Sequence, residues 1–205
     1  MKFLTAALCL LIVAPFSHAA DLALEVLDEV NLARTQPQRY AQFVADRAPT
    51  WRGRDAGALQ EAVRFLQKAR PLPALSWSEG MGQAALSHVN DSGSRGGRGH
   101  TGADGSAPWD RMARYGKHSG HAGENIDYGH REARAIVIAL IIDDGVRGRK
   151  HRVNLFSKNF RVAGIAVGSH AGFGSMCVMD FATGFAERGQ ERIATRSMSG
   201  GMALF

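Results

Sequence analysis

Three glycine-containing segments carry the histidine and carboxylate side chains that could do chemistry. The first contains His100, the second contains Glu124, and the third, residues 143–155, contains two aspartates and His151. Two imidazoles with carboxylates form a donor set for zinc, copper or nickel, and they also form an acid–base pair. The two histidines are far apart in the sequence and neither lies in a compact motif such as His-Glu-x-x-His, so the spacing leaves both hypotheses open.

Asp144 is the most informative carboxylate on physical grounds. It continues the apolar stripe of a predicted helix, four residues after Leu140 and seven after Val137. It also lies at the helix C-terminus, where the macrodipole disfavours a negative charge by about 0.3–1 kcal/mol. A carboxylate in this position needs a partner, so we take Asp144 as a cleft candidate and expect Asp143 to be solvated or to cap a turn. The alternative is a salt bridge to one of the arginines that follow, Arg147, Arg149 or Arg152.

The other reactive side chains are predicted to have structural roles. His88 lies on the apolar face of a helix and should be packed and hydrogen-bonded, whereas His170 is predicted to be a loop residue. Cys177 lies in a strand-like run, which is typical of a small buried side chain rather than a nucleophile. No Gly-x-Ser-x-Gly elbow is present. Three further histidines in glycine-rich segments are expected to be exposed: His118, His121 and His130.

Helices that position these groups are predicted mainly in the first two thirds of the chain. The apolar spacing in 21–44 gives one helix ending near Arg34 and another starting at Pro37. Ser76 is expected to be an N-cap, with Glu79 completing a capping box. Further helices are predicted over 56–69, 106–115 and 131–144, and a strand hairpin over 162–169 and 174–181. Helices followed by strands favour a largely antiparallel sheet over a doubly wound parallel one.

The two ends of the chain differ from this central region. Residues 1–19 have a positive start, an apolar core and a small-residue cleavage site, as secretory signal peptides do, although an uncleaved anchor is the alternative. The apolar run is shorter than the roughly 20 residues that span a bilayer, so we expect a secreted or periplasmic protein and not an integral membrane protein. Residues 187–205 are polar and glycine-rich and are expected to be poorly ordered. The net charge is +6, but the arginines are dispersed, so no nucleic-acid partner is expected.

The order of several short motifs resembles that of the CAP superfamily, also called the SCP domain, in its bacterial branch. This superfamily is named for cysteine-rich secretory proteins, antigen 5 and plant pathogenesis-related proteins. The matching segments are Val30–Arg34, Leu75–His88, Gly99–Gly105 (similar to "SHTSPDG"), Ala122–Ile126 (the "GENI" motif) and His151–Leu155 (similar to "GHRxNIL"). The resemblance covers nearly all of residues 21–186. It implies one domain, over residues 20–186, with an α+β fold: an α–β–α sandwich with a central, mostly antiparallel sheet.

The resemblance also implies a cleft with two histidines and two acidic residues. His100 and His151 match the histidines and are the metal-ligand candidates, with zinc as the candidate ion. Glu124 matches one glutamate. The second glutamate has no clean counterpart, and Asp144, or less closely Asp143, stands near its position. The resemblance thus predicts a secreted, non-catalytic protein that binds a divalent cation or a small ligand in this cleft, with a lipid or a cell-envelope component as further candidate partners.

An enzyme is the alternative function. In that hypothesis the protein is a metal-assisted hydrolase of peptide or cell-wall material, and Glu124 activates a water bound to zinc. Catalytic zinc sites usually have three protein ligands, so Asp144 would have to join His100 and His151. A metal-free acid–base pair of His151 and Glu124 is a third hypothesis.

Overall fold

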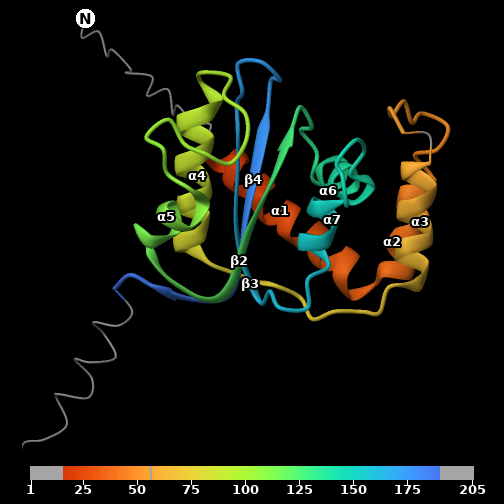
Figure 1. Ribbon diagram of the computed structural model, residues 1–205, viewed down its shortest axis with the longest axis horizontal. Helices are drawn as coiled ribbons and strands as arrows, with labels where there is room; N and C mark the ends of the chain where they lie inside the picture. The colour runs from red at the N-terminus through yellow and green to blue at the C-terminus, as the bar shows by residue number, and fades with distance from the viewer. Residues whose placement is uncertain (1–15, 56, 190–205) are drawn as a thin grey trace, which may run out of the picture.

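A computed structural model, which describes residues 16–55 and 57–189, shows four strands in one sheet with helices on both faces (Figure 1). The strand order is β1-β3-β4-β2. The short β1 (Ser76–Trp77) pairs in parallel with β3 (Val162–Gly168), and β4 (Met176–Glu187) pairs antiparallel with both β3 and β2 (Gly116–Tyr128). The predicted α+β sandwich with a mostly antiparallel sheet is therefore confirmed, and β2 is an edge strand.

Seven helices are present in the described residues. On one face of the sheet lie α4 (Glu79–Gly93) and α5 (Pro108–Ala113). On the other face lie α1 (Phe16–Thr35), α6 (Ala133–Ile142) and α7 (Lys150–Leu155). The remaining two, α2 (Pro37–Ala45) and α3 (Ala58–Lys68), pack against each other beyond α6.

The period-two alternation of the strands divides the core between the two faces of the sheet. Ile165 and Phe181 pack toward α1 and α6 in the largest apolar cluster, whereas Ala166 and Val178 pack toward α4. Each fully buried side chain of this size contributes about 1.5–3 kcal/mol. The sheet is thus held by apolar packing on both faces, and its polar side chains are concentrated on β2.

Two polar residues of α1 hold the connections on either side of the sheet. Asn31 exchanges two hydrogen bonds with the backbone of Leu75, at 2.7 and 2.9 Å. The fully buried Arg34 donates to the carbonyl oxygens of Pro73 and Leu155. Burial, with the nearby Arg161, lowers the pKa of Arg34 to about 10. These bonds tie α1 to the segment before β1 and to the end of α7.

The backbone of α4 lies directly on β3. A Cβ atom at Gly164 would overlap the helix backbone at Met81 and Gly82. Only glycine permits this separation, because any other residue would push the helix away from the strand. The close contact fixes the position of α4, from which the loop that carries His100 leaves.

Most of the predicted helices are present, but some element boundaries differ from the predicted ones. The break at Pro37 is confirmed. Ser76 is not the N-cap of α4: it lies in β1, and Ser78 is the cap, accepting a hydrogen bond from the backbone of Met81. The glycine-containing segment around Glu124, for which no strand was predicted, is part of β2.

The ends of the chain are described only in part. The predicted signal peptide, residues 1–19, lies outside the described residues up to position 15, and residues 16–19 begin α1. Most of the predicted tail, residues 190–205, also lies outside them. None of the described helices is both long and apolar enough to span a bilayer.

Candidate functional site

His100 lies against the buried carboxylate of Glu124. Its Nδ1 is 2.7 Å from Oε1 of Glu124, and Arg111 donates from Nη2 to the other oxygen, Oε2, also at 2.7 Å. The side chains of Glu124 and Arg111 are almost wholly buried, whereas half of the His100 side chain is exposed. Glu124 therefore orients an imidazole whose Nε2 is on the solvent side.

The loop that carries His100 is held from three directions. Buried His88 on α4 bonds through Nε2 to the carbonyl oxygen of Gly99 at 2.8 Å, as the predicted packed histidine would. The hydroxyl of Tyr128 accepts the Gly99 N–H at 2.9 Å. Arg111 donates from Nη1 to the carbonyl oxygen of His100 at 3.0 Å. Burial lowers the pKa of His88, which favours the neutral imidazole.

His151 has an equivalent carboxylate partner, and it is Asp143. Asp143 Oδ1 is 2.7 Å from Nδ1 of His151, and Oδ2 accepts the backbone N–H of His151 at 2.8 Å. Asp143 is buried rather than solvated, because α6 ends at Ile142, and it takes the other role predicted for it by capping the turn at the start of α7. Asp143 then adopts a left-handed conformation (φ 54°), which turns its side chain toward the start of α7.

The structure places Asp144, the carboxylate preferred in the sequence analysis, away from both histidines. Its two oxygens accept the backbone N–H groups of Arg54 and Asp55, at 2.7 and 2.9 Å. The alternative salt bridge to an arginine is not formed either, since Arg149 pairs with Asp55 and Glu61. Asp144 thus fixes the loop before α3.

The two histidine–carboxylate pairs lie on opposite sides of β2. Glu124 points to the face covered by α5, and the next residue, Asn125, points to the face covered by α7, as alternation along a strand requires. Asn125 donates to the carbonyl oxygen of His151 at 3.0 Å. Asn154 in turn donates to Asn125 at 2.9 Å. The edge strand therefore connects the two imidazoles through adjacent residues.

The arrangement does not match the donor set of a zinc centre. In the part of the chain that the structure describes, no three His, Cys, Asp or Glu side chains are gathered so that they could hold a metal ion. Each imidazole already uses Nδ1 for its carboxylate. This leaves one nitrogen from each of two histidines, whereas zinc sites have three or four protein ligands.

Asp180 lies behind Glu124 and was not identified from the sequence. It is the register partner of Glu124 on β4 and is fully buried. Neither of its carboxyl oxygens accepts a hydrogen bond from a donor group of the described residues. Burial, and secondarily the nearby Glu124, raise the pKa of Asp180 well above its usual value.

Two other histidines, one in a loop and one partly exposed as predicted, have contacts that the sequence did not show. His170 is buried: its Nδ1 accepts the N–H groups of Gly172 and Phe173, and its Nε2 bonds to the carbonyl oxygen of Gly97. It is therefore a structural part of the β3–β4 turn. His130 bonds through Nδ1 to Asp127, which raises the pKa of this histidine.

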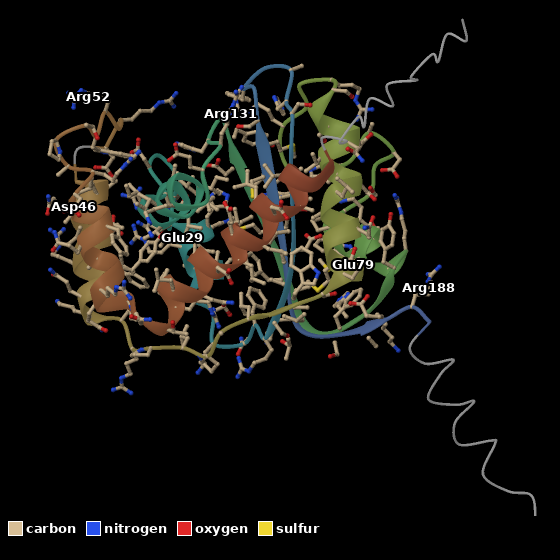
Figure 2. The ribbon with its side chains drawn as sticks, turned by 180° about the vertical axis from the view of Figure 1, so that it is seen from behind. Glu29, Asp46, Arg52, Glu79, Arg131 and Arg188 are labelled. Atoms are coloured by element: carbon tan, nitrogen blue, oxygen red, sulfur yellow. The ribbon has the colours of Figure 1, made fainter. Side chains whose placement is uncertain are left out.

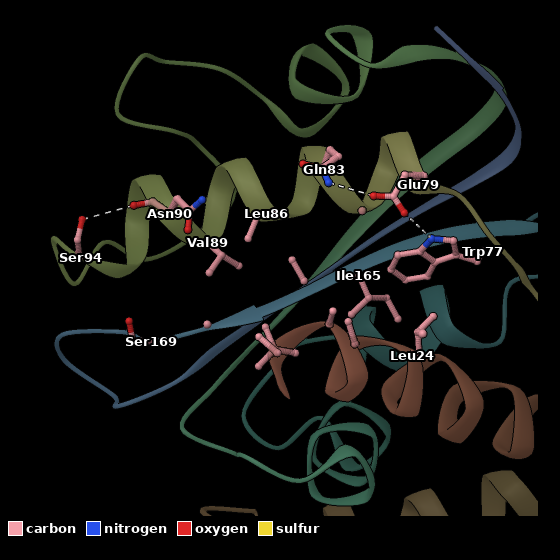
Figure 3. Close-up of a pocket in the computed structure, with 17 residues that line it drawn as sticks. Leu24, Trp77, Glu79, Gln83, Leu86, Val89, Asn90, Ser94, Ile165 and Ser169 are labelled. Atoms are coloured by element: carbon pink, nitrogen blue, oxygen red, sulfur yellow. Dashed lines mark hydrogen bonds between the residues drawn. The ribbon is translucent and has the colours of Figure 1, made fainter. Parts of the chain in front are cut away.

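A second candidate site is an apolar pocket of about 580 Å³ between α1, α4 and β3 (Figure 3). Leu24, Leu86, Val89 and Ile165 line its middle. One end has Trp77, Glu79 and Gln83, where Glu79 accepts hydrogen bonds from both neighbours. The other end has Asn90, Ser94 and Ser169. The pocket is thus apolar in the middle and polar at both ends.

The fold and the two histidine–carboxylate pairs define an α–β–α protein of the type that the motif order predicts. The model of the cysteine-rich secretory protein (CAP) family matches residues 27–181, and the chain belongs to this family.

The solved structures that are similar to the chain include two bacterial proteins, whereas no curated protein sequence matches it. An outer surface protein of Borrelia burgdorferi has 18% sequence identity and a TM-score of 0.46, over 54% of this chain and 78% of that one. An extracellular SCP-domain protein of Bacillus anthracis strain Ames has 22% identity and a TM-score of 0.43, over 62% of this chain and 40% of that one.

Proposed function

We propose that the protein is a secreted, non-catalytic binding protein that holds the acyl chain of a lipid in the pocket between α1, α4 and β3. The export signal in residues 1–19 supports secretion. The size and lining of the pocket support the ligand class, because small-molecule sites of 300–1,000 Å³ are typically lined by apolar side chains with a few polar groups. The polar cleft at His100 and His151 is a second surface for a small polar ligand.

The observation that carries this proposal is the separation of polar and apolar groups along the pocket. Leu24, Leu86 and Ile165 surround its middle, where an acyl chain would be removed from water at about 25 cal/mol per Å² of apolar area. The amide and hydroxyl groups of Asn90 and Ser94 at one end are partners for a polar head group.

The test is binding of a naturally fluorescent polyene fatty acid to the mature protein beginning at Ala20. Leu24→Lys places a charge in the pocket and should weaken binding at least tenfold. Val153→Lys is the matched control, because both side chains are helical and exposed, at 47% and 61%, but Val153 is not part of the pocket. Equal affinity of wild type and Leu24→Lys, or no binding by either, would contradict the proposal.

A metal-free acid–base hydrolase in the polar cleft is the second candidate function. It is favoured by the two imidazoles, each oriented through Nδ1 by a buried carboxylate, as a histidine base is oriented in hydrolytic sites. Hydrolysis of peptide, ester or peptidoglycan substrates that is lost in both His151→Ala and Glu124→Ala would establish this function. Absence of turnover, with lipid binding intact, would leave the binding protein.

A further inference from the structure

Two charged groups lie near the buried carboxyl of Asp180: Glu124, opposite it on β2, and Arg111 on α5. Two histidines lie further from it in the same cluster: His100 contacts the far side of Glu124, and His88 on α4 interacts electrostatically with Arg111 and Glu124. On the other side of Asp180, β3 contributes only Gly164. One guanidinium therefore faces two buried carboxyl groups.

Three buried atoms of this cluster have no hydrogen-bond partner among the described residues: Nε of Arg111 and both carboxyl oxygens of Asp180. Glu124 receives Arg111 at Oε2 and His100 at Oε1, and both of these donors are used. Asp180 is within hydrogen-bonding reach of Glu124, but two ionised carboxylates contain no donor. Ionisation of both of two neighbouring buried carboxyl groups is unfavourable, since the like charges repel in a medium of low polarity.

We propose that Asp180 is protonated in the folded protein and donates its O–H to Glu124. Glu124 accepts from Asp180, Arg111 and His100. Asp180 is thereby a positioning residue for His100, because it helps hold the carboxylate that fixes the imidazole with Nδ1 inward and Nε2 toward the cleft. The inference concerns the polar cleft and does not depend on lipid binding in the apolar pocket.

Infrared spectroscopy of the wild-type mature protein tests this directly. A protonated carboxyl has a C=O stretch that is separate from the carboxylate bands, and surface carboxyls are ionised well above about pH 4. We expect such a band at pH 7, and we expect it to shift when aspartate is labelled with ¹³C and to be lost in Asp180→Asn. No band at pH 7, or a band that shifts only with labelled glutamate, would overturn the proposal.

Equilibrium unfolding gives a second, independent readout. Asp180 binds a proton more tightly in the folded state than in the unfolded state, so its contribution to stability falls as the pH rises above about 4. The Asp180→Asn variant does not have this pH-dependent loss of stability. Its urea midpoint should therefore rise relative to that of wild type between pH 4 and pH 8. Asp127→Asn is the matched control. Asp127 is also a buried carboxylate of the β2–β4 strand pair, but it is paired with His130, so removing its charge should lower the urea midpoint. A midpoint for Asp180→Asn that falls relative to wild type as the pH rises would contradict the proposal.

Discussion

Asp143 contacts His151 twice, once at the ring nitrogen Nδ1 (2.7 Å) and once at the backbone N–H (2.8 Å). A single carboxylate thus orients the imidazole and caps the first turn of α7. It does so because it follows the last residue of α6 in a left-handed conformation. The short path from the end of one helix to the start of the next is what positions His151.

Substitution of Asp143 should therefore be more costly than substitution of its neighbour. Asp143→Ala removes both contacts and should lower the free energy of unfolding by about 1–3 kcal/mol, since it leaves buried groups unpaired. Asp143→Asn keeps an acceptor and tolerates the left-handed backbone, so it should cost less. Asp144→Ala is the control, expected to cost about 1 kcal/mol because its contacts are at the surface. Urea denaturation of the three variants measures this, and equal losses for Asp143→Ala and Asp144→Ala would count against it.

The buried pair of Arg111 and Glu124 predicts a non-additive effect. Arg111→Met leaves an uncompensated buried carboxylate and should lower the free energy of unfolding by about 3–5 kcal/mol. The double variant Arg111→Met/Glu124→Gln has no such charge and should recover part of that loss. A double-mutant cycle by chemical denaturation measures the coupling between the two residues. Strictly additive losses of stability would show that Arg111 and Glu124 do not act as a pair.

The pair of His130 and Asp127 predicts a pH-dependent contribution. The hydrogen bond to Asp127 raises the pKa of His130, so its contribution is fully present below the unfolded value, about pH 6.5, and is lost as the pH rises through the folded value. His130→Gln should be less stable than wild type at pH 5.5 by roughly 0.5 kcal/mol or less, given the exposure of the ring. The difference should shrink by pH 8.5, as thermal unfolding at both pH values would show. A constant difference would exclude the charge as its cause.

Zinc should bind weakly at His100 and His151, because each of these histidines has only one ring nitrogen left for it. Calorimetric titration of the mature protein and of the double variant His100→Ala/His151→Ala should therefore give similar, low affinities at neutral pH. Tight binding by the wild type alone would show that the cleft rearranges around a metal ion, and it would restore the zinc-dependent hydrolase.

The sequence predicts most helices and the final hairpin, but not β2. This strand, residues 116–128, contains three glycines and several polar residues, and Ile126 is its only β-branched side chain. The usual alternation is therefore absent. Hydrogen bonds to β4, rather than the local sequence, determine that it is a strand.

The error at Asp144 has a different cause. The apolar stripe extends the predicted helix two residues too far, to 144, since α6 ends at Ile142 and the chain turns. His100, Glu124 and His151 were found because they lie in recognisable motifs. Arg111 and Asp180 were not, because their importance comes from contacts across the sheet that local spacing does not show.

The glycine contact between α4 and β3 has a consequence for how fast a ligand could leave the apolar pocket. The backbone of α4 lies directly on β3 at Gly82 and Gly164, so the wall of the pocket that α4 forms should be the rigid one. The opposite wall is the N-terminal part of α1, where Ala20, Ala23 and Leu24 line the pocket of the mature protein. Helix ends open at low free energy compared with packed interiors. The residence time of a bound molecule should therefore depend on fraying at the start of α1, and a mutation that stiffens this end should slow both entry and exit.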